Sequence, residues 1–248
     1  MITRRALFIA GAGGLVTGCD ALGRNESVRA LLKSGEDGNY AIHRTIIDRN
    51  ALAKEFAPSQ RSLVFRANGT RMPSGDAYAQ HMATGFNDWQ LVIDGLVARP
   101  QAHSLAALKA MPSRSQITRH DCVEGWSAIG KWTGVPLKHL LDQANMSPRA
   151  NYVIFHCADP QSNGTMYYES VDMIDALHPQ TMLAWALNDT LLPVPNGAPL
   201  RLRVERQLGY KHAKYVQRIE VVASLGDVYG GKGGFWEDAA GYEWYAGA

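Results

Sequence analysis

The stretch RHDCVEGWS at residues 119–127, followed by KWTGVPL at residues 131–137, sets a cysteine in a strongly patterned environment. Cys122 is one of only 3 cysteines in 248 residues, so we expect it to be present for the chemistry of its sulfur rather than for its bulk. A thiolate is a soft donor that ligates metals, attacks electrophiles or forms disulfides. Three interpretations of Cys122 therefore compete: metal ligand, nucleophile and disulfide partner.

The composition is that of a folded globular protein. Hydrophobic residues make up 46% of the chain and charged residues 19%, which suits one large domain or two small ones. The formal net charge is +2, and the Lys and Arg residues are spread out rather than gathered in the basic stripe of a nucleic-acid-binding protein. The 8 His residues form no HxxxH or cysteine-rich zinc spacing. We therefore expect no nucleic-acid partner and no zinc site.

Residues 1–19 have the order of an export signal. Adjacent Arg4 and Arg5 precede an apolar run that is too short to span a bilayer as a mature helix. Paired arginines are typical of the twin-arginine route, which exports folded proteins and so suits a cofactor inserted beforehand. VTGC at residues 16–19 resembles a lipoprotein cleavage box. We therefore expect a periplasmic protein. A lipid anchor at Cys19 is a further hypothesis, and an ordinary secretory signal is the alternative interpretation of these residues.

The remaining chain divides into an N-terminal extension (20–62), a central domain (63–225) and a tail rich in glycine and aromatic residues (226–248). Helices are expected at 28–32, 51–56, 105–111 and from Pro136 onward. Strands are expected at 63–67, 152–157, 200–205 and 215–223, with hairpins at 89–97 and 182–192. Because no linker divides the chain after residue 85, these elements favour a single domain of the α+β class.

Two interpretations of Cys122 meet specific objections. As a nucleophile it has His120 and Glu124 two residues away, whereas catalytic Cys–His pairs usually come from distant segments. As a disulfide partner it needs Cys157 with its Cα atom within about 7 Å, and an oxidising compartment makes that pairing a serious alternative. We favour a buried, inert role for Cys157, which follows the apolar residues 152–155.

A metal held by one thiolate needs its other donors from a cofactor, and such a cofactor needs an anion-binding region. NGAPLR at residues 196–201 places a turn directly before a strand that bears arginines. GYKHAK at residues 209–214 adds a glycine, two lysines and a histidine. Arginine forks and lysine ammonium groups suit a phosphate. The alternative is a solvated basic face that pairs with Glu205 and Glu220.

Taken together, these segments resemble the sulfite-oxidase-like molybdopterin oxidoreductases. They are most similar to the bacterial periplasmic branch typified by the catalytic subunit of the protein-methionine-sulfoxide reductase. The similarity covers about residues 63–225 and depends on the order and spacing of the motifs. It implies a sulfite-oxidase-type molybdopterin-binding domain, with mixed β-sheets and flanking helices, that holds a molybdenum–molybdopterin (Mo-MPT) cofactor.

The resemblance also implies roles for individual residues. Cys122 matches the cysteine that ligates molybdenum, and Asn196 and Arg201 match contacts to the pterin. The segment that grips the terminal phosphate of the cofactor is matched by His212, Ala213 and Lys214.

Three further matches are weaker. Asn68 resembles an early pterin-contacting asparagine, although residues 69–71 depart from the family's pattern. Asp159 and Ser162 lie where the family often has another cofactor contact. For the walls of the pocket, the candidates are Trp126, Trp132, Tyr167 and Tyr168, and core packing is the alternative for each.

Departures from the family set the expected activity. The sequence has no Cys-x-x-Cys-His haem motif, so we expect no haem and a separate electron partner, either a membrane haem protein or a cytochrome. Sulfite oxidation in the family relies on clustered arginines, whereas Arg119 is the only arginine near Cys122 in the sequence.

The resemblance therefore predicts oxygen-atom transfer with two-electron Mo(VI)/Mo(IV) cycling, acting on a small or protein-bound sulfoxide in the periplasm. A sulfite dehydrogenase that passes electrons to a cytochrome is the alternative enzyme. A non-catalytic exported lipoprotein that acts as a binding module is the alternative of another class.

Overall fold

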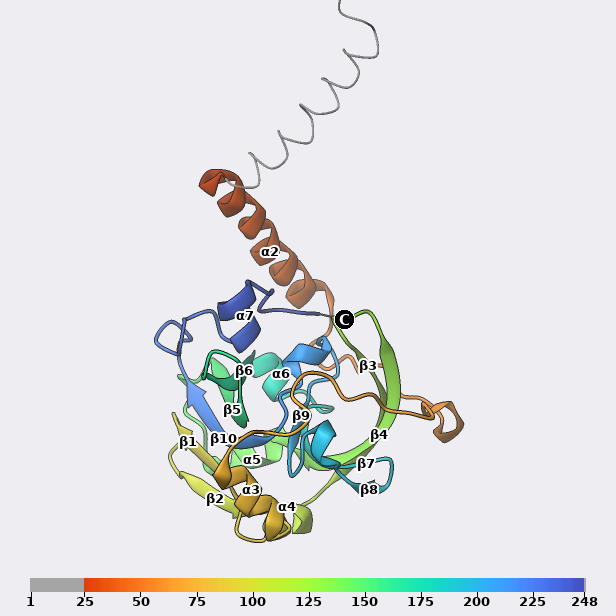
Figure 1. The fold of residues 1–248 in the computed structure, drawn as a ribbon. Coiled ribbons are helices and arrows are strands. Elements are labelled where there is room, and N and C mark those ends of the chain that lie inside the picture. The colour runs from red at the N-terminus through yellow and green to blue at the C-terminus, as the bar shows by residue number, and fades with distance from the viewer. Residues whose placement is uncertain (1–24, 248) are drawn as a thin grey trace, which may run out of the picture. The chain divides into compact units, whose positions relative to one another are not determined.

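The computed structural model describes residues 25–247 (Figure 1). The chain separates into two units, Met1–Asp48 and Arg49–Ala248. The expectations about the export signal and Cys19 concern residues 1–19, which lie outside the described part. Within that part, none of the helices combines the length and the apolar character needed to cross a bilayer.

Helix α2 (Glu26–Ile46) is the described element of the first unit. The side chain of Asn25 caps it by accepting hydrogen bonds from the backbone N–H groups of Ser27 (3.0 Å) and Val28 (3.3 Å). The helix is much longer than the predicted 28–32. Gly35 and Gly38 caused the underestimate, because glycine is a poor helix former and breaks the apolar periodicity.

The first sheet of the second unit has the order β2-β1-β10-β5-β6 (Figure 1). Its strands are β1 (Gln90–Gly95), β2 (Gln101–Ser104), β5 (Tyr152–Pro160), β6 (Met166–Asp172) and β10 (Val216–Val222). The last strand, β10, occupies the centre, parallel to β1 and antiparallel to β5. Side chains of Val216, Ile219 and Val221 from this strand are fully buried in the core. The strands predicted at 152–157 and 215–223 are confirmed.

The hairpin predicted at 89–97 is wrong, although its first strand exists. β1 pairs with β2 and β10, and the chain leaves the strand at Gly95, which has a φ of 83°. A Cβ atom at Gly95 would lie 2.3 Å from the Val221 carbonyl oxygen, so only glycine permits this approach. Leu96 then donates its backbone N–H to that same oxygen (2.7 Å) instead of turning back along β1.

The second sheet has the order β3-β4-β7-β8, with β9 also paired to β7. Its strands are β3 (Arg114–Asp121), β4 (Ser127–Pro136), β7 (Met182–Leu187), β8 (Thr190–Leu191) and β9 (Arg201–Arg203). The predicted hairpin at 182–192 is confirmed as β7–β8. Its turn residues, Asn188 and Asp189, adopt positive φ angles of 52° and 67°, which suit a tight turn.

Helices flank these sheets, so the α+β class with mixed sheets is confirmed. They are α3 (Asp76–Ala83), α4 (Leu105–Ala110), α5 (Leu137–Ala144), α6 (Met173–Ala176) and α7 (Phe235–Ala240), with 3-10 turns η1 (Pro58–Gln60), η2 (Val194–Asn196) and η3 (Gly209–Lys211). The helices predicted at 105–111 and after Pro136 are confirmed. Leu137, Leu140 and Leu141 of α5 are fully buried, since their spacing places them on one face.

Two other predicted elements are absent. Residues 51–56 form no helix; Glu55 instead makes an isolated bridge with Thr118 of β3. Residues 63–67 form no strand, and the side chains of Leu63 and Val64 are exposed. The chain around these residues is held against the second sheet by individual hydrogen bonds, such as the one from Phe56 N to Ile117 O (2.9 Å). Local apolar content therefore misled the prediction, because contacts with a distant strand fix these loops.

Candidate functional site

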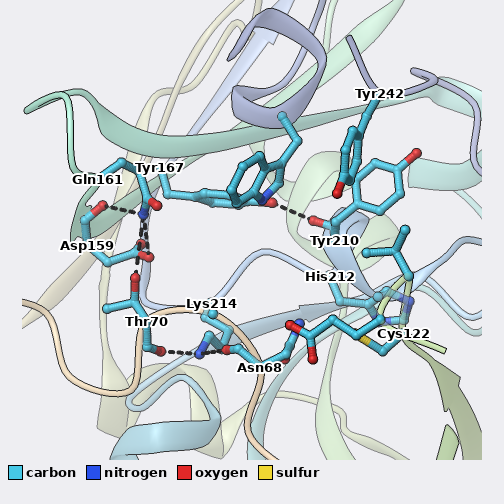
Figure 2. A pocket seen from close by; sticks show the side chains of 15 residues that line it. Asn68, Thr70, Cys122, Asp159, Gln161, Tyr167, Tyr210, His212, Lys214 and Tyr242 are labelled. Atoms are coloured by element: carbon cyan, nitrogen blue, oxygen red, sulfur yellow. Dashed lines mark hydrogen bonds between the residues drawn. The ribbon is translucent and has the colours of Figure 1, made fainter. Parts of the chain in front are cut away.

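A cavity of about 210 Å³ opens among segments that are far apart in the sequence (Figure 2). Its walls come from residues 68–70, the turn after β3, the end of β5, the segment 209–214 and the C-terminal tail. Several predicted site residues line it: Asn68, Cys122, Asp159, His212 and Lys214.

Cys122 lies in the turn between β3 and β4. Its backbone N–H donates to Trp126 O (2.9 Å), and its carbonyl accepts from Gly125 N (3.0 Å). Gly125 has a φ of 84°, a conformation that glycine adopts without strain. The closed turn holds the Cys122 side chain, 7% exposed, at the wall of the cavity.

The sulfur of Cys122 is a free thiol. Cys157 is also free and fully buried, so the disulfide alternative is wrong. Burial raises the pKa of the Cys122 thiol, and the nearby Arg201 charge opposes that rise only in part. His120 is not positioned as its base, because the Nδ1 of His120 accepts a hydrogen bond from Arg203 (3.0 Å). The site therefore lacks the activated thiolate of a cysteine hydrolase.

Arg201 is a fully buried cation beside the cavity. Its only hydrogen bond among the described residues joins one terminal nitrogen to Asn196 O (3.2 Å), and its Nε and other terminal nitrogen have no partner there. Burial, followed by the charge of Arg203, lowers the pKa of Arg201 to about 9. A buried guanidinium with unsatisfied N–H groups is costly unless an anion or an acceptor meets it.

The other arginine of β9 differs sharply. Arg203 makes two hydrogen bonds to Glu205, at 2.9 Å from Nε and 2.6 Å from the terminal nitrogen, and both side chains are fully buried. It also lies over the ring of Trp132, 4.3 Å from its centroid. The expectation of a solvated basic face on 200–205 is therefore wrong, because both faces of β9 are buried. Trp132 belongs to the core, fully buried, and does not line the cavity.

Lys214 forms the floor of the cavity next to Asn68. Its Nζ donates to the carbonyl oxygens of Asn68 (2.6 Å), Pro195 (3.1 Å) and Thr70. Burial and then the charge of Arg201 lower the pKa of Lys214 to about 7. These three carbonyl oxygens occupy the three N–H donors of the ammonium group, so Lys214 would attract a negative ligand through its charge rather than through a free donor.

His212 is neutral and has one free acceptor. Its Nε2 lies 2.9 Å from Gln207 O, and because a carbonyl only accepts, Nε2 carries the proton. Nδ1 is buried without a partner among the described residues. Burial, together with Arg203 and Arg201, lowers the pKa of His212 well below its usual value.

Asp159 lines the opposite end of the cavity from Cys122 in Figure 2. Its Oδ2 accepts from Gln161 Nε2 (3.1 Å), while Oδ1 is buried with no partner in the described part of the chain. Burial raises the pKa of Asp159 to about 6.

Not every predicted site residue lies in the cavity. Ser162 is exposed in the turn before β6, and Ala213 is buried with its carbonyl bonded to Leu202 N (2.8 Å). Asn196 is buried behind the lining, and its amide nitrogen has no partner among the described residues.

Several lining residues were missed by the sequence analysis: Thr70, Val123, Glu124, Gln161, Gly209, Tyr210, Trp236 and Tyr242. Gly209 had a readable signal inside the GYKHAK motif. A Cβ atom there would lie 2.6 Å from His120 Nε2, so glycine lets the segment reach the ring. Trp236 and Tyr242 had no such signal, because they reach the cavity only through the folding of the tail.

Residues 78–227 match the family described as oxidoreductase molybdopterin binding domain. The chain belongs to this family. It is 38% identical over 245 residues to a putative protein-methionine-sulfoxide reductase subunit YedZ1 of Azospira oryzae, with 99% of this chain and 86% of that protein covered.

Other relatives of this molybdopterin-binding domain are longer. The protein-methionine-sulfoxide reductase catalytic subunit MsrP of Xanthomonas campestris pv. campestris is 37% identical over 147 residues, or 55% of this chain and 46% of that protein. MsrP of Ralstonia nicotianae is 37% identical over 144 residues, covering 54% and 44%. The chain thus matches less than half the length of these MsrP relatives.

The sulfane dehydrogenase SoxCD from Paracoccus pantotrophus shares the fold, with a TM-score of 0.51, 24% sequence identity, and coverage of 56% of this chain and 39% of that one.

The residues of the cavity fit a molybdopterin cofactor. Molybdopterin offers a phosphate and a pterin with donors and acceptors, and the site offers unpartnered buried groups of both kinds. Acceptors come from His212, Asp159 and Asn68 of the lining, and donors come from Arg201 and Asn196, which are buried outside the lining. A free thiol lines the same space. The chain is a molybdopterin-dependent oxidoreductase, and its cavity provides the chemistry that such a cofactor requires.

Proposed function

We propose that this oxidoreductase reduces a sulfoxide, with Cys122 as the protein ligand of molybdenum. The observation that carries the proposal is one shared cavity. A free thiol lies there beside buried polar groups that lack partners among the described residues. The relatives named as protein-methionine-sulfoxide reductase subunits support a sulfoxide as the substrate.

Each group of residues has a distinct task. Lys214 and the segment from His212 to Lys214 would hold the phosphate, because a cation lies there among neutral carbonyls. Asn68, Asp159, Asn196 and Arg201 would hold and orient the pterin through their unpartnered atoms. The turn between β3 and β4 would present the sulfur of Cys122, which is buried although residues 123–125 of the turn are exposed. When bound, the cofactor supplies the two-electron Mo(VI)/Mo(IV) couple for oxygen-atom transfer.

The overall reaction balances with an external electron donor. The sulfoxide loses its oxygen, two electrons and two protons are taken up, and a thioether and water are released. A separate haem protein or cytochrome is the proposed source of the electrons, in keeping with the absence of a Cys-x-x-Cys-His motif in the sequence. The paired arginines Arg4 and Arg5 support export to the periplasm by the twin-arginine route, and Cys19 is the proposed site of lipidation.

The charges of the cavity favour a sulfoxide over sulfite. Among the described lining residues, Lys214 is the only Lys or Arg, whereas Glu124 and Asp159 bring carboxyl groups. A dianion such as sulfite would be repelled by the carboxyl group of Glu124, two residues from the thiol, whereas a neutral sulfoxide would not be repelled. Sulfite dehydrogenation is therefore the second candidate.

The test compares both reactions with purified holoenzyme. We expect about one molybdenum per chain, reduction of methionine sulfoxide by a reduced dye, and little sulfite oxidation with an oxidised dye. Protein that carries molybdenum but oxidises sulfite and ignores sulfoxides would contradict the proposed substrate. Protein purified after native export without molybdenum would instead support the binding module.

The ligand assignment has its own test. Cys122→Ser should abolish sulfoxide reduction and alter the Mo(V) electron paramagnetic resonance spectrum, because the hard oxygen of serine replaces a soft sulfur donor. Cys157→Ser is the matched control, and its spectrum should match that of the wild type. An unchanged spectrum and full activity in Cys122→Ser would remove Cys122 from the metal site.

A further inference from the structure

The C-terminal tail forms one wall of the cavity. Trp236 and Tyr242 line it, and both lie beyond residue 227, where the match to the family ends. The cofactor-holding groups described above all come from residues 68–214. The tail therefore adds a surface to the cavity that the family-defining segment does not provide.

The wall is a cluster of stacked aromatic rings. The ring centroids of Tyr242 and Trp236 lie 5.7 Å apart at 25°, and Tyr242 meets Tyr210 edge to face at 5.1 Å. The hydroxyl of Tyr210 donates to Glu243 O (2.6 Å), which joins this wall to the tail backbone. In Figure 2 the rings of Tyr210 and Tyr242 lie on one side of the cavity, and Cys122 and Lys214 lie on the other.

A buried ion cluster fixes this wall in place. Lys211 Nζ bonds to Glu237 of α7 (2.8 Å) and to Glu169 of β6, and all three side chains are at most 1% exposed. At Gly234, just before α7, a Cβ atom would lie 2.1 Å from Glu237 Oε2, so a larger residue there would push against the ion cluster. Asp238 accepts hydrogen bonds from Gly230 N (2.9 Å) and Lys232 N (3.0 Å). These contacts make the wall preformed rather than a loose flap.

We propose that this tail-built aromatic wall is the specificity-determining surface for the apolar arm of a methyl sulfoxide. The inference rests on the proposed function and names its substrate class. Aromatic rings pack against methyl and methylene groups, and they carry no positive charge that would bind an inorganic anion. A substrate with an alkyl arm, such as a methionine sulfoxide side chain, fits this surface better than a bare oxyanion.

The experiment uses Trp236→Ala and Tyr242→Ala in the full-length holoenzyme. N-acetylmethionine sulfoxide is the probe with an alkyl arm, and dimethyl sulfoxide is the small probe. Calorimetry with oxidised holoenzyme gives the Kd without turnover, and assays with a reduced dye give KM and kcat. We expect Kd and KM for N-acetylmethionine sulfoxide to rise about fivefold, with a smaller change for dimethyl sulfoxide. The value of kcat and the molybdenum content should stay within twofold of the wild type.

Two further variants separate recognition from folding. Trp236→Phe keeps an aromatic ring and should restore most of the affinity. Trp244→Phe removes a tail indole whose Nε1 donates to Ser170 Oγ (2.8 Å) and which does not line the cavity, so its Kd should equal that of the wild type.

Three results would overturn the inference: unchanged Kd and KM in both alanine variants, loss of molybdenum from them, or equal weakening for both probes. Each leaves the proposed function intact, because the wild type still reduces sulfoxides. A molybdenum-loaded wild type that reduces no sulfoxide would instead refute the proposed function.

Discussion

Arg201 and Arg203 sit two residues apart in the same short strand and have opposite electrostatic situations. Arg203 has Glu205 as a buried counter-charge, whereas Arg201 has two nitrogen atoms with no partner among the described residues. Buried charges are stable only when they are paired or bonded. The contrast supports the proposed role of Arg201 in binding an external ligand, whereas Arg203 is part of the framework.

This contrast predicts different outcomes for the same substitution. Arg203→Gln should lower the free energy of unfolding by about 3 kcal/mol, because it leaves the buried Glu205 carboxylate without its counter-charge, with only the hydrogen bond from Gln116 remaining. Arg201→Gln should leave the free energy of unfolding of the cofactor-free protein unchanged or raise it slightly. The same variant should lower the molybdenum content of the purified protein. Urea unfolding and metal analysis measure the two effects. Equal destabilisation by both variants would contradict the assignment.

Asp159 gives a prediction about pH. Burial raises its folded pKa to about 6 from an ordinary value of 3.8, so the folded state binds this proton more tightly than the unfolded state. The stability that the folded protein gains from protonated Asp159 is therefore complete below pH 3.8 and is lost as the pH rises towards 6. Above that, ionised Asp159 costs about 3 kcal/mol.

Asp159→Asn should accordingly make cofactor-free protein more stable than the wild type at pH 8 and leave it similar at pH 4. Urea unfolding at the two values measures the difference. Asp142→Asn is the control, because Asp142 is an exposed residue on α5 that pairs with Lys138 at the surface. The same difference at both pH values for Asp159→Asn would show that this carboxyl group is not perturbed.

Part of the site could be predicted at this scale. The motifs that contain Cys122, His212 and Lys214 are contiguous in sequence, and the fold brings them to one cavity. Ser162 was misplaced because a turn exposes it, a choice that depends on the conformation of residues 161–165. Trp236 and Tyr242 could not be predicted, because no local pattern reports which surface a glycine-rich tail will cover.

At the scale of elements, the Lys211 ammonium group is the charged link between α7 and β6, beside the hydrogen bond from Tyr168 to Asp238. Lys211→Met should lower the free energy of unfolding by about 3 kcal/mol, because it leaves Glu169 and Glu237 as facing buried carboxyl groups. Lys138→Met is the control: its exposed pair with Asp142 is worth at most about 1 kcal/mol. Chemical unfolding and limited proteolysis of the tail measure the effect. A tail that stays equally resistant in Lys211→Met would show that the ion cluster is dispensable.

Elements defined by their own sequence were predicted well, and elements defined by distant partners were not. Helix α5 and the β7–β8 hairpin follow from apolar spacing and a turn pair, Asn188 and Asp189. Segment 51–56 depends on bonds to β3, and segment 63–67 follows Ser62, whose backbone N–H bonds to Ile129 of β4; no local pattern reveals these partners. For β9, the alternating pattern correctly placed Leu202 in the core. It did not reveal that Arg201 and Arg203 are also buried, because neighbouring segments of the chain cover them.

At the scale of the whole molecule, the division at residue 48 predicts that the second unit is self-sufficient. A chain of residues 49–248 should fold, bind the cofactor and unfold within about 4 °C of the full-length protein, because its core lies entirely within that range. Circular dichroism, thermal unfolding and metal analysis check this.

A chain of residues 49–225 is the informative comparison, since it lacks Glu237 and leaves Lys211 with one counter-charge. It should be markedly less stable than the 49–248 chain. Equal stability of the two shortened chains would show that the tail contributes nothing to the domain.

The position of β10 has a consequence for biosynthesis. The ribosome makes this strand after β1 and β5, yet it must insert between them. Until then the nascent polypeptide exposes two unpaired edges, which invite aggregation and call for chaperone protection. Cys122 also leaves the ribosome before Arg201 and Lys214, so the groups proposed to hold the prosthetic group cannot come together until residue 214 has been made.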